Sequence, residues 1–200
     1  MVSAVEAPVV VRRALLVRIL LVWGVNPSGG PGRQETCMLH FVTGDILLSD
    51  SDVLAHGVAP GDHFENGLAL ALRERWPGMY KDFRHYCHVS NPKPGGLWAW
   101  GGPGGRRIVN LFTQEPPQGH HGSGHPGPAK TKHVNHSLKA LAKLIKKEKW
   151  PSVALPKLAT GVGDLDWDEV KPLIEKHLGG LEADVYVYEV FHAGEEAAEG

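Results

Sequence analysis

Apolar and polar positions alternate along the chain in segments typical of strands and helices. Strands are predicted at 39–43, 52–59, 97–100, 107–112, 152–156 and 184–191, and helices at 68–76, 77–87, 129–149 and 167–178. In the longest of these helices Val134, Leu138 and Leu141 recur at helical spacing, which predicts one buried face. Strands that alternate with helices favour a sheet covered on both faces. We therefore predict a three-layer α/β/α sandwich with a mixed, mainly parallel central sheet.

Residues 8–23 are strongly apolar but do not fit this alternation. Arg12, Arg13 and Arg18 interrupt them, and a central arginine costs a spanning helix at least about 2.5 kcal/mol. Glu6 precedes the run and no small-residue cleavage site follows, unlike in a signal peptide. We expect residues 1–37 to lie outside the domain, with a start site at Met38 as one explanation. A docked helix or strand, and a targeting or surface-anchoring segment, remain alternatives.

Composition narrows the class of protein. A chain of 200 residues is long enough for one domain with its own core, which we place at 38–192, followed by a disordered acidic tail at 193–200. A net charge of −1 argues against a nucleic-acid binder that depends on bulk basicity. Two cysteines cannot form a secreted disulfide framework, so we expect a reducing, cytoplasmic location and no membrane partner.

Two groups of charged or metal-ligating residues leave alternatives open. The polar face of the 129–149 helix carries seven lysines and one glutamate, which fits either a solvated face or an anionic partner. His120, His121 and His125 lie in one short glycine- and proline-rich loop, and imidazoles bind Zn²⁺ or Ni²⁺. No dependable fourth ligand is nearby, so we predict no metal site and no cofactor.

Three segments place small and polar residues at the ends of predicted strands, where ligands bind in open α/β sheets. Asp45 follows the first strand and offers a carboxylate to an exocyclic amine, or else caps a turn. Asn66 and Gly67 precede a helix whose free N–H groups suit an anion, with Asn66 as a plain N-cap the alternative. The glycine loop at 160–163 suggests a backbone cradle for a diphosphate. His56 ends a buried strand beside this region, as a ligand contact or a core histidine.

These segments, in this order, resemble a macrodomain, the module that binds ADP-ribose. The likeness covers about residues 38–192 and is closest to the branch that contains ADP-ribosyl-glutamate and DNA hydrolases. It rests on Gly44-Asp45, Ala55-His56, the sequence Glu-Asn-Gly-Leu-Ala at 65–69 and the loop from Pro156 to Trp167. The expected binding residues are Asp45, Ile46, His56, Asn66, Gly67, Leu68, Thr160, Gly161, Val162, Gly163 and Phe191. The resemblance implies that Asp45 and Ile46 hold adenine, that Phe191 stacks on it, and that the glycine loop wraps the phosphates.

Departures from the family pattern concern catalysis. Gln114 stands where the similar enzymes have a lysine that attacks the anomeric carbon, and an amide is a poor nucleophile. Gly163 replaces an aspartate of one subgroup, and Glu65 replaces a glycine. We therefore expect binding of ADP-ribose or of an ADP-ribosylated macromolecule, with nucleic acid only as an ADP-ribosylated substrate.

Hydrolysis of the ADP-ribosyl linkage by carboxylate-activated water is the alternative function. Asp164 is the better candidate for the catalytic carboxylate and Glu65 the second. A module that binds another nucleotide, or nucleic acid through the lysine face, is a third hypothesis.

Overall fold

The computed structural model describes residues 39–117 and 125–199. Its strands are β1 (Leu39–Gly44), β2 (Val53–Val58), β3 (Leu97–Gly101), β4 (Arg107–Phe112), β5 (Ser152–Pro156) and β6 (Asp184–Phe191). Its helices are α1 (Gly67–Arg75), α2 (Pro77–Ser90), α3 (Thr131–Glu148) and α4 (Trp167–Leu178), with short 3₁₀ turns η1 (Ile46–Leu48) and η2 (Pro103–Gly105). The predictions for residues 1–37, and for His120 and His121, lie outside the described residues.

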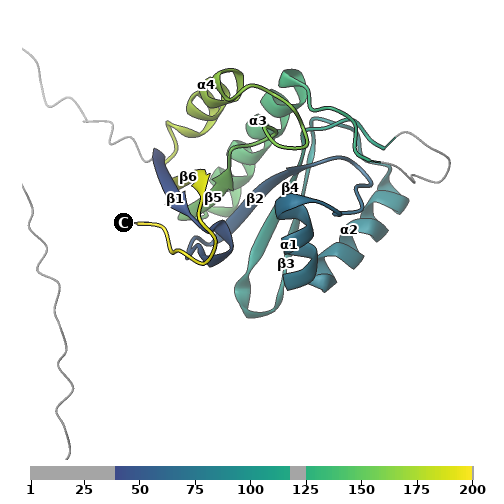
Figure 1. Ribbon diagram of the computed structural model, residues 1–200, viewed down its shortest axis with the longest axis horizontal. Coiled ribbons are helices and arrows are strands. Elements are labelled where there is room, and N and C mark those ends of the chain that lie inside the picture. Colours follow the sequence, from purple (N-terminus) through teal and green to yellow (C-terminus); the bar gives the residue numbers. More distant parts are fainter. Residues whose placement is uncertain (1–38, 118–124, 200) are drawn as a thin grey trace, which may run out of the picture. The chain divides into compact units, whose positions relative to one another are not determined.

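The strands form one sheet in the order β1-β6-β5-β2-β4-β3. All neighbours are parallel except β3 and β4, which pair antiparallel. Helices α1 and α2 cover one face of the sheet, and α3 and α4 cover the other (Figure 1). The predicted three-layer sandwich with a mixed, mainly parallel sheet is confirmed.

Burial on both faces explains the apolar pattern of the central strands. In β2, Val53 and Ala55 pack with the α3 and α4 side chains, while Leu54 and Val58 pack with those of α1 and α2. Such a strand is apolar throughout because neither face meets water. The predicted stripe of α3 is also buried, from Val134 to Ile145, whereas its lysines are exposed.

Chain direction gathers the loops that form the site. The five parallel strands point the same way, so the segments that follow β1, β2, β5 and β6 leave the sheet at one edge. Helix N-termini lie at this edge as well, because α1 follows β2 and α4 follows β5. This edge is where ligands bind in open α/β sheets.

The C-terminal residues differ from the predicted disordered tail. The Asp45 N–H donates to the carbonyl of Glu195 at 2.7 Å. The Glu199 carboxylate accepts hydrogen bonds from the Ser49 hydroxyl at 2.7 Å and the Tyr188 hydroxyl at 2.8 Å. Composition alone suggested disorder, but the glutamate at 199 meets a cluster of donors that only the folded domain assembles.

Within residues 39–117 and 125–199, none of the helices combines the length and apolar character that crossing a membrane requires.

Candidate functional site

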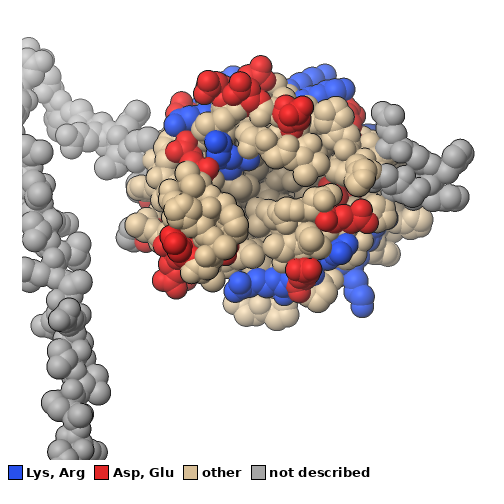
Figure 2. Space-filling model, in the orientation of Figure 1, with Lys and Arg blue, Asp and Glu red and all other residues tan. Residues whose placement is uncertain are grey.

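Two connected cavities lie at the edge where the parallel strands end. The proximal cavity, next to β1 and β6, has a volume of about 430 Å³, and the distal cavity, next to β2 and the glycine loop, of about 220 Å³. Gly67, Leu68 and Pro156 line both, so the two form one elongated cleft. Figure 2 shows this face of the molecule hollowed, with mainly uncharged walls and charged side chains along the rim.

The cleft brings together nearly all predicted binding residues. Asp45, Ile46, Gly67, Leu68 and Phe191 line the proximal cavity, and His56, Asn66, Gly67, Leu68, Gly161, Val162 and Gly163 line the distal one. Thr160 lines neither cavity. Its hydroxyl donates to the Lys157 carbonyl at 3.1 Å, a hydrogen bond within the same loop.

The proximal cavity combines an apolar platform with a fixed carboxylate. The Phe191 side chain is 69% exposed at the end of β6, whereas Ile46 is buried. Asp45 caps η1 by accepting from the Leu47 N–H at 3.0 Å, and its other oxygen accepts from the Gly194 N–H at 3.1 Å. A carboxylate has about four acceptor positions, so capacity for a further donor remains. The turn-cap hypothesis for Asp45 is therefore confirmed, and it is compatible with a ligand contact.

Backbone donors line the distal cavity. Gly161, Val162 and Gly163 donate no backbone hydrogen bond to any acceptor within 39–117 and 125–199. The same lining includes the start of α1 at Gly67, whose φ of 54° suits glycine. Asn66 is the N-cap residue of α1, as the N-cap alternative predicted, but its side chain makes no capping hydrogen bond. Unpaired N–H groups from a glycine loop and a helix start favour an anion between them.

The two glycines of this loop differ in the space around them. A Cβ on Gly161 meets no atom within 4 Å, whereas a Cβ on Gly163 lies 2.6 Å from the Ala159 carbonyl and 2.8 Å from the Ala129 Cβ. An aspartate at position 163 therefore does not fit this loop. Gly163 is required by packing, and Gly161 is free to face the cleft.

Gly163→Ala is expected to lower the unfolding free energy by about 1–3 kcal/mol, because the added methyl overpacks the contact with Ala159 and Ala129. Thermal and urea unfolding would measure this loss. Gly161→Ala is the matched control and should melt like the parent protein. Equal stability of both variants would contradict the packing role of Gly163.

His56 is held in one protonation state at the base of the distal cavity. The side chain is buried, and its Nε2 lies 2.8 Å from Oδ1 of Asn110. The Asn110 amide nitrogen faces the Trp98 carbonyl at 3.5 Å, so Oδ1 is the acceptor and His56 Nε2–H the donor. Burial lowers the pKa of His56 to about 4, although the Asn110 bond opposes this. The ring is therefore neutral at pH 7, and Nδ1 is its acceptor nitrogen.

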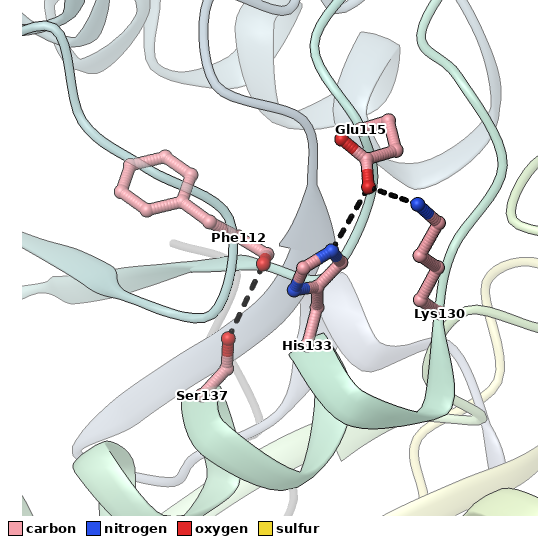
Figure 3. Close-up of polar contacts among 5 residues, drawn as sticks. All are labelled: Phe112, Glu115, Lys130, His133 and Ser137. Atoms are coloured by element: carbon pink, nitrogen blue, oxygen red, sulfur yellow. Dashed lines mark hydrogen bonds and ion pairs between the residues drawn. The ribbon is translucent and has the colours of Figure 1, made fainter.

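Gln114 lies in the wall of the same cavity, fixed by its surroundings. Its Nε2 donates to the Gly127 carbonyl at 3.3 Å. The next residue, Glu115, pairs with Lys130 at 2.6 Å and His133 at 3.0 Å at the start of α3 (Figure 3). The hydrogen bond from Lys130, and then that from His133, lower the pKa of the Glu115 carboxyl. This cluster ties the end of β4 to α3 and holds Gln114 in place.

The structure adds two charged residues that the sequence predictions missed. Asp62 and Lys157 are the charged side chains in the lining of the distal cavity. The Lys157 ammonium lies 5.2 Å from the centre of the Trp167 ring. Lys157 follows β5 directly and was visible as a cation beside the glycine loop. No sequence motif marked Asp62 as a site residue, because a position in a loop does not predict whether the side chain is buried.

The predicted catalytic carboxylates lie outside the lining. Asp164 is exposed, with a φ of 58°, and Glu65 is exposed at the start of α1. Neither is among the residues that line either cavity. Asp164 as a catalytic residue therefore stays a prediction. Among the described residues no three histidine, cysteine or acidic side chains gather as metal ligands.

Comparison with known proteins identifies the fold family. The macrodomain of Thermus aquaticus DarG superimposes with a TM-score of 0.65 and 29% identity, covering 76% of this chain and 97% of that one. The described domain is a macrodomain. No protein-family model matches the chain. The structure of Thermosipho africanus DarTG in complex with ADP-ribose has a TM-score of 0.67, at 21% identity over 82% of this chain and 44% of that one.

Curated relatives of this macrodomain are longer proteins. The DNA ADP-ribosyl glycohydrolase of Thermus aquaticus is 31% identical over 156 residues, which are 76% of this chain and 41% of that protein. The enzyme of the same name from Mycobacterium tuberculosis is 26% identical over 139 residues, 67% of this chain and 37% of that protein. The chain thus spans about two fifths of the relatives that it matches.

Proposed function

We propose that this macrodomain binds ADP-ribose in the elongated cleft. Adenine lies in the proximal cavity between Asp45 and Phe191, the diphosphate lies between the glycine loop and the start of α1, and the distal ribose lies in the distal cavity. The observation that carries the proposal is the division of one cleft into two parts, a proximal cavity with an aromatic platform and a carboxylate, and a distal cavity with backbone donors and polar side chains. These two parts match the two parts of the ligand, adenine and the diphosphate with its distal ribose.

The relatives support DNA as the carrier of the ADP-ribosyl group. Two curated proteins that this chain resembles are named for removing ADP-ribose from DNA. The net charge of −1 gives no bulk attraction for nucleic acid. Recognition therefore depends on the ADP-ribosyl group itself, and DNA enters as an ADP-ribosylated ligand.

Calorimetric titration tests the proposal with ADP-ribose as the ligand. AMP, NAD and unmodified single-stranded DNA are the comparisons. AMP lacks the second phosphate and the distal ribose, NAD carries nicotinamide on the distal ribose, and the DNA lacks the ADP-ribosyl group. Tighter binding of ADP-ribose than of all three supports the proposal. Binding of single-stranded DNA with no response to ADP-ribose would instead support the lysine face as a nucleic-acid surface.

Asp45→Ala is expected to weaken ADP-ribose binding by about 1.5–3 kcal/mol, because a charge-assisted hydrogen bond to the adenine amino group is lost. Titration of the purified variant measures the change. Asp45 also caps η1, so Asp45→Asn serves as the companion variant that retains an acceptor for the Leu47 N–H. Unchanged affinity in a folded Asp45→Ala protein would show that adenine binds elsewhere.

Hydrolysis of the ADP-ribosyl linkage is the second candidate function, favoured by the names of the curated relatives. Gln114 lines the cavity in place of a lysine nucleophile, and the loop has no room for an aspartate at Gly163. Any hydrolysis would then depend on another carboxylate that activates water. Incubation with ADP-ribosylated DNA, glutamate and arginine substrates separates the two functions, since release of ADP-ribose marks the enzyme.

A further inference from the structure

Asp62 is a buried carboxylate in the wall of the distal cavity. It belongs to the loop between β2 and α1 and is 6% exposed. Its Oδ1 accepts from the Phe64 N–H at 2.8 Å, and its Oδ2 lies 3.5 Å from the Ala59 nitrogen. The loop therefore fixes the carboxylate, while two backbone contacts leave part of its acceptor capacity unused.

The charge of Asp62 is not balanced by an ion pair. Arg84, the guanidinium of this region, donates to the backbone carbonyls of Gly61 and Asp62 rather than to the carboxylate. Within the described residues no Lys, Arg or His forms an ion pair with Asp62. Burial raises the pKa of this carboxyl. The adjacent His63 lowers this pKa, but burial outweighs it. Asp62 is thus a buried acidic residue of the cavity wall that backbone N–H groups hold, with no ion pair to it among the described residues.

Two further polar side chains of the same lining, His56 and Gln114, have acceptor atoms that no described donor uses. Neutral His56 uses its N–H for Asn110, which leaves Nδ1 as an acceptor nitrogen. Gln114 uses its amide nitrogen for the Gly127 carbonyl, which leaves its own carbonyl oxygen. Three side chains that line one small cavity therefore offer oxygen or nitrogen lone pairs. These three acceptors complement hydroxyl groups, which donate, and disfavour phosphate, which accepts and carries negative charge. Lys157 and the glycine loop of the same lining have the opposite character, since they offer positive charge and N–H donors.

We propose that Asp62 is a specificity residue that accepts hydrogen bonds from hydroxyl groups of the distal ribose and excludes nucleotides with an anionic group at that position. This inference rests on the proposed function, which places the distal ribose in the distal cavity. Lys157 and the glycine loop attract the diphosphate, and Asp62, in the same cavity lining, rejects a further phosphate. The protein would select ADP-ribose over a nucleoside triphosphate because Lys157 is positively charged and Asp62 is negatively charged.

Three adenine nucleotides test the proposal by calorimetry in buffer with EDTA and no divalent cation. ADP ends at the diphosphate, ADP-ribose adds the distal ribose, and ATP adds a phosphate at the same place. The parent protein is expected to bind ADP-ribose at least about tenfold more tightly than ATP, since one charge-assisted hydrogen bond contributes about this factor. A parent protein that binds ADP-ribose and ATP equally would overturn the proposal without any variant.

Asp62→Asn removes the negative charge of the carboxylate and retains an acceptor oxygen for the Phe64 N–H. We expect ADP-ribose affinity to fall about tenfold, ADP affinity to stay constant and ATP affinity to rise. Glu74→Gln is the matched control, because it removes the same charge from an exposed position on α1 and should change none of the three. Melting curves establish that both variants fold.

The outcomes separate the two proposals. An unchanged ratio of ADP-ribose to ATP affinity in folded Asp62→Asn shows that Asp62 does not select the ligand, while ADP-ribose binding itself stands. Failure of the parent protein to bind ADP-ribose overturns the proposed function instead. A fall in affinity for all three nucleotides alike would assign Asp62 to the stability of the loop and overturn its role in specificity.

Discussion

Replacing Gly161 with glutamate is expected to abolish ADP-ribose binding and to leave the melting temperature of the free protein unchanged. Gly161 is exposed and lines the distal cavity, and a Cβ there meets no atom within 4 Å. The new side chain therefore fits the fold but adds a carboxylate where the diphosphate is expected. Like charges placed directly together cost several kcal/mol, so affinity should fall at least about a hundredfold. Calorimetric titration and a thermal melt without ligand measure the two effects.

Two companion variants identify the origin of this loss. Gly161→Ala adds bulk without charge and should retain most of the affinity. Gly161→Gln adds nearly the volume of glutamate without its charge. If charge causes the loss, Gly161→Gln should bind ADP-ribose much more tightly than Gly161→Glu does. If Gly161→Glu bound ADP-ribose normally, the phosphate cradle would lie elsewhere and the orientation of the ligand along the cleft would be wrong.

The free energy of unfolding is expected to rise with pH between about 4 and 6.5, with His56 as a principal cause. Burial lowers the pKa of His56 from 6.5 to about 4. Between these values the unfolded chain binds a proton that the folded chain does not, so higher pH favours the fold. The contribution is complete above 6.5 and is lost as pH falls toward 4. The gap between the two pKa values corresponds to about 3 kcal/mol at most.

Urea unfolding at pH 7 and pH 4.5 measures this contribution as a difference between proteins. His56→Asn removes the titrating ring, so its stability should depend less on pH than that of the parent protein, whatever the baseline cost of the substitution. His85→Asn, which removes an exposed histidine from α2, is the control and should keep the parent's pH dependence. Equal pH dependence of the His56→Asn and parent proteins would contradict the burial argument.

Much of the site was predictable because its parts are local in sequence. Asp45, Gly67 and Gly161 each follow or precede a strand or helix that the apolar pattern predicts, and all three line the cleft. Parallel strands bring such segments to one edge, so their convergence follows from the fold class. The direction of a loop side chain does not follow from the fold class. Thr160, which we expected to contact the phosphates, instead forms its hydrogen bond within its own loop.

The same distinction applies to the carboxylates. Asp164 and Glu65 were chosen for their position beside glycine motifs, yet both are exposed and neither lines a cavity. Asp62 lines the distal cavity without any motif around it. Burial of a loop carboxylate depends on what packs over the loop, and for Asp62 this includes α2, whose Arg84 donates to the Asp62 carbonyl at 3.4 Å. The spacing of residues in the sequence does not predict that contact between Arg84 and Asp62.

The sequence by itself determined the order of strands and helices, the mixed α/β architecture and the family, because periodicity and glycine motifs are properties of neighbouring residues. The tertiary structure alone decided which polar groups are buried and what they face. A Cβ on Gly163 would meet the Cβ of Ala129, thirty-four positions earlier, as well as the Ala159 carbonyl of its own loop. His56 is neutral because segments far from it in the chain bury its ring, and this burial outweighs the hydrogen bond with Asn110, which raises its pKa. Desolvation and steric exclusion act between segments far apart in the chain, and a linear pattern does not encode them.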